Sequence, residues 1–197
     1  MLGCMGRKDL GAVPALSVFD QEFAELQILW RRTGGESLPR RRQLGARALK
    51  HWLPQITLID VVGTPPRFRI RLMGTACVKY SCGEFTGRWI DECVHENDGD
   101  KILGALNECV QSAAPVRSAS CYALSSVRRL IIHRLHLPCA EDGRSVDAIV
   151  SCVYGHEIVS GSFASDGGPN GGTEAVRAAV GDKIARLLTA LPGSRAP

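Results

Sequence analysis

Residues 67–72 constrain this chain most, because arginine and apolar side chains alternate along them without a break. Alternation with a period of two predicts a β-strand that has one buried face and one face in water. We therefore expect Phe68, Ile70 and Leu72 to point into a core. The Pro-Pro pair just before this strand cannot continue a ladder, since proline has no N–H to donate. The apolar run at 56–62 then becomes the first strand of a hairpin.

A helix and three further strands are predicted downstream of the hairpin. Apolar residues recur at helical spacing over 97–112, which indicates an amphipathic helix with one buried stripe. Strand patterns follow at 116–124, 128–137 and 145–154, and an acidic turn containing Gly143 joins the last two. The expected inward faces of the last two strands are Arg129, Ile131, His133, Leu135 and Leu137, and Val146, Ala148, Val150, Cys152 and Tyr154.

Short motifs in this order resemble those of the PAS domain family, in particular small bacterial PAS-like proteins. They are the Arg-x-Arg-Leu-x-Gly-Thr strand at 69–75, the Thr-Gly-Arg at 86–88 and the Leu-Pro at 137–138. The resemblance covers about residues 19–155, and it rests on the order and spacing of the motifs. It implies an α+β fold: a five-stranded antiparallel sheet with helices on one face, plus flanking N- and C-terminal helices. It also implies a role in sensing or interaction, and no reaction.

Composition divides the chain into five segments around one core. Residues 1–18 are loose, 19–52 hold flanking helices and a basic loop, and 53–159 form the PAS-like core. A linker rich in glycine and serine follows at 160–172. A last helix is expected at 173–191, where apolar residues again recur at helical spacing. We expect this helix to dock reversibly and to carry a signal.

The N-terminal flanking region contains a second apolar stripe outside the minimal core. A helix is predicted near residues 19–33, and a shorter one over 45–52. The stripe of the first helix could pack on its own domain or against a second copy of the chain, and both interpretations stay open. A flanking helix of a PAS core often pairs two copies, so we expect a homodimer. The candidate interface residues are Phe19, Phe23, Leu26 and Trp30.

A pocket between the helix at 97–112 and the sheet is the expected site, and a small apolar or aromatic molecule is its expected ligand. His133 is either a hydrogen-bonded core residue or a group that holds a ligand or haem, so the cofactor is left unknown. His133 and Tyr154 are the polar candidates on the expected inward faces. The pocket candidates are Phe68, Ile70, Leu72, Trp89, Leu106, Cys109, His133, Leu135, Val150 and Cys152.

Other function classes find no support in the sequence. The 8 cysteines form no Cys-x-x-Cys pair, so we predict no metal site and expect reduced thiols in a cytoplasmic protein. No apolar run approaches the ~20 residues that a membrane span needs. The basic segment at 31–50 lacks interleaved aromatic residues, so it is interpreted as a solvated connector and no nucleic acid is expected. No phosphate-binding loop or nucleophile elbow occurs.

The functional prediction is a PAS-type sensory or regulatory module without a fused effector, which binds a small molecule, a protein partner, or both. The alternative is an interaction or dimerisation adaptor with a solid core and no ligand. An enzyme is not expected, since it would need a buried acid or base in the pocket.

Overall fold

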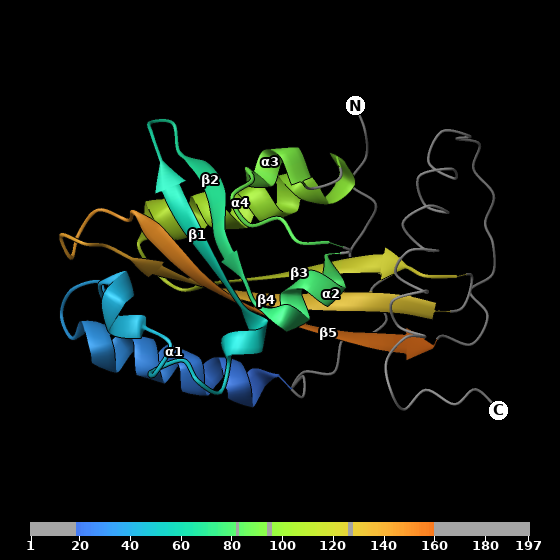
Figure 1. Ribbon diagram of the computed structural model, residues 1–197, viewed down its shortest axis with the longest axis horizontal. Helices are drawn as coiled ribbons and strands as arrows, with labels where there is room; N and C mark the ends of the chain where they lie inside the picture. Colours follow the sequence, from blue (N-terminus) through green and yellow to red (C-terminus); the bar gives the residue numbers. More distant parts are fainter. Residues whose placement is uncertain (1–18, 82, 94–95, 126–127, 160–197) are drawn as a thin grey trace.

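The computed structural model describes residues 19–159, apart from positions 82, 94–95 and 126–127 (Figure 1). The segments predicted at 1–18, 160–172 and 173–191 lie outside the described residues.

The centre of the fold is one antiparallel sheet of five strands in the order β2-β1-β5-β4-β3. The first two strands form a hairpin, and three helices separate them from the last three strands. This order, with helices inserted between β2 and β3, is PAS-like and confirms the predicted α+β class. The strands are β1 (Ile56–Val62), β2 (Arg67–Met73), β3 (Val116–Ala123), β4 (Arg128–Cys139) and β5 (Ala148–Val159).

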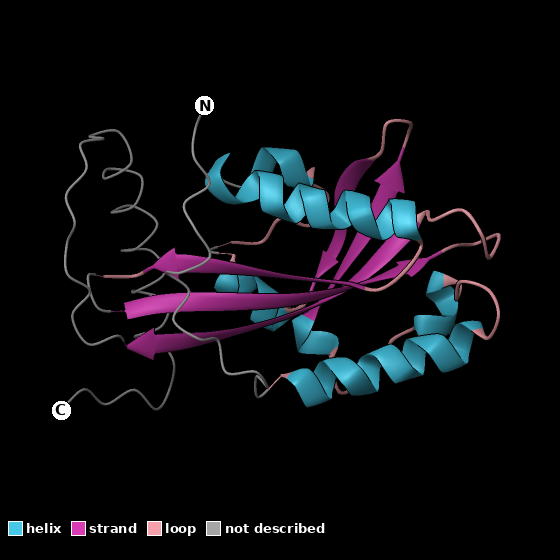
Figure 2. Cartoon of the chain, turned by 180° about the vertical axis from the view of Figure 1, so that it is seen from behind, coloured by secondary structure: helices cyan, strands magenta, loops and turns pink. Residues whose placement is uncertain are grey.

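Helices cover both faces of the sheet, so the molecule has three layers (Figure 2). The face toward α2 (Thr75–Tyr80), α3 (Ile90–Cys93) and α4 (Glu96–Ser112) is called the inner face below. The opposite, outer face is covered by α1 (Asp20–Gly34). The central strands are therefore buried on two sides, and alternation along them places apolar residues on each side in turn.

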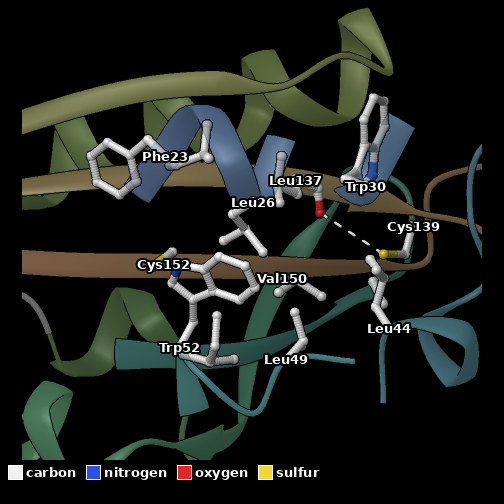
Figure 3. Packing of buried hydrophobic residues seen from close by; sticks show 13 residues of the cluster. Phe23, Leu26, Trp30, Leu44, Leu49, Trp52, Leu137, Cys139, Val150 and Cys152 are labelled. Carbon is white, nitrogen blue, oxygen red and sulfur yellow. Dashed lines mark hydrogen bonds between the residues drawn. The ribbon is translucent and has the colours of Figure 1, made fainter. Parts of the chain in front are cut away.

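The outer layer is held by an apolar cluster between α1 and the central strands. Phe23, Leu26 and Trp30 recur at helical spacing and are all buried. Figure 3 shows Leu26 directed toward Val150 of the sheet, with Phe23 and Trp30 on either side of it along α1. The Trp30 indole Nε1 also donates a hydrogen bond of 2.7 Å to the Pro138 carbonyl.

The basic segment contributes to this layer, which the sequence interpretation missed. Its apolar residues Leu44 and Leu49 are each only 2% exposed and pack beneath α1. The helix predicted at 45–52 is wrong. The segment forms turns there, between the 3-10 helices η1 (Arg41–Leu44) and η2 (Leu53–Gln55). Burial of single apolar residues, without a continuous stripe, fixes this segment.

Strand β2 departs from strict alternation at its end. Phe68 and Ile70 are buried as predicted, but Leu72 is 46% exposed, so its assignment to the core is wrong. The register explains the difference, because Ile59 pairs with Ile70 whereas Leu58 pairs with Leu72. This bulge leaves one extra residue in β2 and turns Leu72 to the outside.

The Thr-Gly-Arg motif forms a turn that pairs with the edge of β2. The Gly87 N–H donates to the Ile70 carbonyl over 2.6 Å, and the Ile70 N–H donates to the Arg88 carbonyl over 2.8 Å. Gly87 has φ of +87°, a conformation that side chains with a Cβ rarely adopt. The motif therefore covers an edge strand that would otherwise expose unpaired backbone groups.

Candidate functional site

The inner face has an apolar region toward each end of its long strands. The first lies beneath α4, where Leu106 and Cys109 are fully buried against the sheet. The second lies toward α2 and is smaller. The members of the first are Ile59, Phe68, Ile70, Ile90, Ala105, Leu106, Cys109, Val116 and Ile149, and those of the second are Cys77, Leu130, Ile132 and Val153.

A row of polar side chains separates these two apolar regions. Strand pairing places Ser151 of β5 opposite His136 of β4, and Ser118 of β3 opposite Arg134 of β4. Arg134 precedes His136 by two residues, so both lie on the same face of β4. Ser118 Oγ lies 3.1 Å from His136 Nε2, and Ser151 Oγ lies 3.1 Å from His136 Nδ1. Both ring nitrogens of a histidine that is only 1% exposed are thus satisfied.

The environment of His136 keeps its imidazole neutral. Burial, and to a lesser extent the nearby Arg134 guanidinium, lowers the pKa of His136 to about 3. A general base works best when its pKa lies near the operating pH. The Ser-His contacts in this row therefore support a structural hydrogen-bond network better than a catalytic dyad.

Arg134 is the charged member of the polar row. Its guanidinium donates hydrogen bonds to Ser120 Oγ over 2.9 Å and to the Tyr122 hydroxyl over 3.4 Å. The side chain is half-buried and lies on the same face as His136, two residues along β4.

The predicted pocket residues do not come together at one site. Phe68, Ile70, Leu106 and Cys109 lie on the inner face, in the cluster beneath α4. The four central-strand candidates lie on the outer face beneath α1, so their assignment to a pocket under the 97–112 helix is wrong. They are His133, Leu135, Val150 and Cys152.

Trp89 covers the edge of the sheet. It forms an isolated bridge with Arg69, and the Arg67 guanidinium lies 4.3 Å from the centroid of its ring. A cation over an aromatic face is a favourable surface contact. The placement of Trp89 is thus explained by edge packing.

His133 belongs to an aromatic stack at the start of α1. Its ring is parallel to that of His156, with centroids 5.3 Å apart, and Phe19 contacts both rings. Phe19 also stacks on Tyr154 at 4.7 Å. Burial, and secondly the neighbouring His156, lowers the pKa of His133, which favours a neutral ring. His133 is thus packed among rings, but it is not the hydrogen-bonded core residue of the first interpretation, because its buried Nε2 has no hydrogen-bond partner among the described residues.

The buried cysteines of the described residues have the character of core residues. Among the described residues, no three His, Cys, Asp or Glu side chains are placed to hold a metal ion. Burial raises the pKa of the Cys109 thiol to about 12, and the same cause raises that of Cys139 to about 12. Thiols with such a pKa are protonated and unreactive at neutral pH.

The candidate dimer residues pack within their own chain. Phe23, Leu26 and Trp30 are at most 9% exposed, so they do not present a surface to a second copy. Phe19 is half-buried in the aromatic stack. The packing of α1 on its own sheet accounts for the stripe, and homodimerisation stays a prediction that requires another surface.

Sequence reasoning missed the polar row itself. Its residues occupy alternate positions on β3, β4 and β5, so period-two alternation along each strand could have placed them on one face. They are Ser118, Ser120, Arg134, His136 and Ser151. The pattern predicts that this face points outward because it is the more polar of the two.

Comparisons with known proteins find similar solved structures only. No family model matches the chain, and no curated protein matches it. Two solved structures are similar to it: a variant of RsLOV with a single substitution, and the Rhodobacter sphaeroides LOV protein. Each has 11% sequence identity to this chain and a TM-score of 0.40. Each match covers 88% of this chain, and it covers 87% of the variant's chain and 85% of the chain of the Rhodobacter sphaeroides protein. The helices of the described residues include none with the length and apolarity to cross a membrane. The strand order of the sheet is what makes the fold PAS-like.

Proposed function

We propose that this chain is a PAS-type sensory or regulatory module that binds a small molecule on the inner face of its sheet. The observation that carries the proposal is the polar row set between two apolar regions on that face. Ligand sites in proteins are mostly apolar and contain a few well-placed polar groups, which is the composition found here.

The layer of helices over the inner face supports this assignment. Helix α4 is anchored at one end, where the Cys109 thiol lies 3.7 Å from the His136 carbonyl oxygen. Helix α2 packs over the other end, where Tyr80 lies against Gly155 so closely that a Cβ there would come within 2.7 Å of the ring. A ligand on the inner face would contact segments from both ends of the helical layer and could shift them together.

In this proposal the outer face serves the packing of the N-terminal helix. It is filled by α1, whose Leu26 is completely buried against the sheet. We further propose that homodimerisation and a protein output partner transmit the signal. Light scattering tests the first of these, and neither depends on the buried stripe of α1.

Native mass spectrometry of freshly purified protein tests the proposed function. A bound mass that recurs between preparations, and is lost when the same sample is measured under denaturing conditions, is the expected result. Absence of any bound mass after expression in several hosts, together with no shift in melting temperature across a small-molecule library, would instead support an adaptor with a solid core.

A further inference from the structure

Arg134 differs from five other strand arginines in the groups that surround it. Ion pairs with carboxylates engage those five guanidinium groups, including the pair between Arg128 and Glu157 on the same face. Arg134 has two hydroxyls as partners, Ser120 Oγ and Tyr122 OH, and no carboxylate of the described residues pairs with it. The paired arginines are Arg67, Arg69, Arg71, Arg117 and Arg128.

The groups around Arg134 leave its charge uncompensated within the described part of the chain. Its neighbour His136 is neutral, and its cross-strand partner Val153 is apolar. Cys77 of α2 is close enough for the guanidinium to act on its thiol, whose pKa is nevertheless raised by burial. Glu157 lies four residues beyond Val153 on β5, roughly 13 Å along the strand, and is already engaged by Arg128.

A half-buried cation without a counter-ion is costly, and this cost is removed when an anion binds. Guanidinium presents five N–H donors in a planar fork that matches the two oxygens of a carboxylate. Two neutral hydroxyls accept hydrogen bonds from part of this fork, and its other donors have no partner among the described residues. The flanking apolar regions favour a ligand that also carries an apolar body.

We propose that the inner face binds a small organic acid, with its carboxylate on the Arg134 guanidinium and its apolar body against one of the flanking clusters. This inference rests on the proposed function, because it names the chemical class of the ligand at the same site. Arg134 is then the residue that selects an acid over a neutral molecule of the same shape.

The test uses the full chain and matched pairs of probes. Benzoate, phenylacetate and indole-3-acetate are titrated by calorimetry and by thermal shift, each beside its neutral amide. The acids should bind saturably, and the amides should bind about tenfold or more weakly because they lack the charge-assisted bond. Inorganic phosphate separates carboxylate recognition from general anion binding.

Two variants locate the effect at Arg134. Arg134→Met keeps the packing volume and removes the fork, and it should weaken acid binding by about tenfold or more. Arg134→Lys keeps the charge and should restore part of the affinity. The matched control is Arg71→Met, on an exposed arginine that pairs with Asp60 away from the inner face, and it should bind as the unmodified protein does. The melting temperature without ligand should not fall in Arg134→Met, whereas a purely structural arginine would give a fall.

The outcomes separate this inference from the function on which it rests. If acids and amides bind equally, if Arg134→Met binds acids normally, or if phosphate competes as well as the acids, the carboxylate site is wrong. A neutral copurified molecule, found while no acid binds, would overturn the carboxylate site and leave the sensory function standing. If no small molecule of any kind binds, both proposals fail.

Discussion

At the scale of single residues, the Gly-Thr pair after β2 has a clear physical reason. A Cβ on Gly74 would lie 2.4 Å from the carbonyl oxygens of both Leu53 and Pro54. The Gly74 N–H also donates to the Ile56 carbonyl over 2.7 Å, so the backbone cannot move away without breaking a bond of the sheet. Glycine is required here for close approach of two backbone segments.

Gly74→Ala should therefore destabilise the protein by at least about 2 kcal/mol, since the clash is with backbone atoms that cannot rotate aside. Gly104→Ala is the matched control, because Gly104 lies within α4 and its Cβ would meet nothing within 4 Å. The control should stabilise by about 0.5–1 kcal/mol through helix propensity. Urea unfolding measures the free energy of unfolding of both variants. Equal effects of the two substitutions would contradict the close approach of the backbone segments at Gly74.

The buried His136 predicts how stability depends on pH. Its pKa is lowered in the folded state to about 3 from the ordinary value of 6.5, so the folded protein binds fewer protons than the unfolded chain. The stabilisation is complete above the unfolded pKa and is lost as pH falls from 6.5 toward 3. The slope from this group approaches about 1.4 kcal/mol per pH unit within that window.

Unfolding by urea at several pH values between about 7.5 and about 5 measures this slope. His136→Gln should flatten it, whereas the same change at His51, which is exposed, should leave it unaltered. A slope that is the same in His136→Gln and in the unmodified protein would show that other groups cause it, including His133, whose pKa is also lowered by burial.

At the scale of elements, α1 behaves as a core helix. Leu26→Ala should cost about 2–5 kcal/mol, because it leaves a cavity beneath a fully buried side chain. Ile28, on the other side of α1, is 56% exposed, and Ile28→Ala should change stability by less than about 0.5 kcal/mol. Thermal or urea unfolding of both variants at two protein concentrations measures these changes in stability. If Leu26→Ala remained as stable as the unmodified protein and only dissociated a dimer, α1 would be an interface helix.

The elements also show what the sequence can predict. The succession of strands, the hairpin and the 97–112 helix follow from turn residues and periodicity, and all three are confirmed. Which side chains of β4 and β5 point toward α4 cannot be predicted in this way, because alternation shows only that the two faces of a strand differ. Both faces are covered here, and which one meets α4 is decided by packing between distant elements. The predicted side is wrong for His133 and Cys152 for this reason.

The candidate site is still harder to predict than the fold. The pattern predicts outward positions for Arg134 and His136, since a polar face of a strand usually meets water. Their burial depends on α2 and α4 covering that face, and no local pattern around residue 134 contains this information. The bulge that exposes Leu72 is equally absent from the local sequence pattern, because it arises from the pairing of β2 with β1.

At the scale of the whole molecule, the two faces of one sheet differ in composition. The outer face is a packed core closed by α1, and its apolar cluster includes residues of the basic segment. The inner face has apolar ends, a neutral buried histidine and a half-buried arginine without a carboxylate partner in the described chain. The central claim is that the inner face binds a small molecule.

A crystal structure of the protein as purified under native conditions tests this claim most directly. We predict density for a small molecule between the sheet and the layer formed by α2 and α4, in contact with Arg134. We also predict that α1 covers the outer face with no ligand beneath it. Density on the outer face, or an inner face filled only by protein side chains with Arg134 paired to a carboxylate of the chain, would contradict the claim.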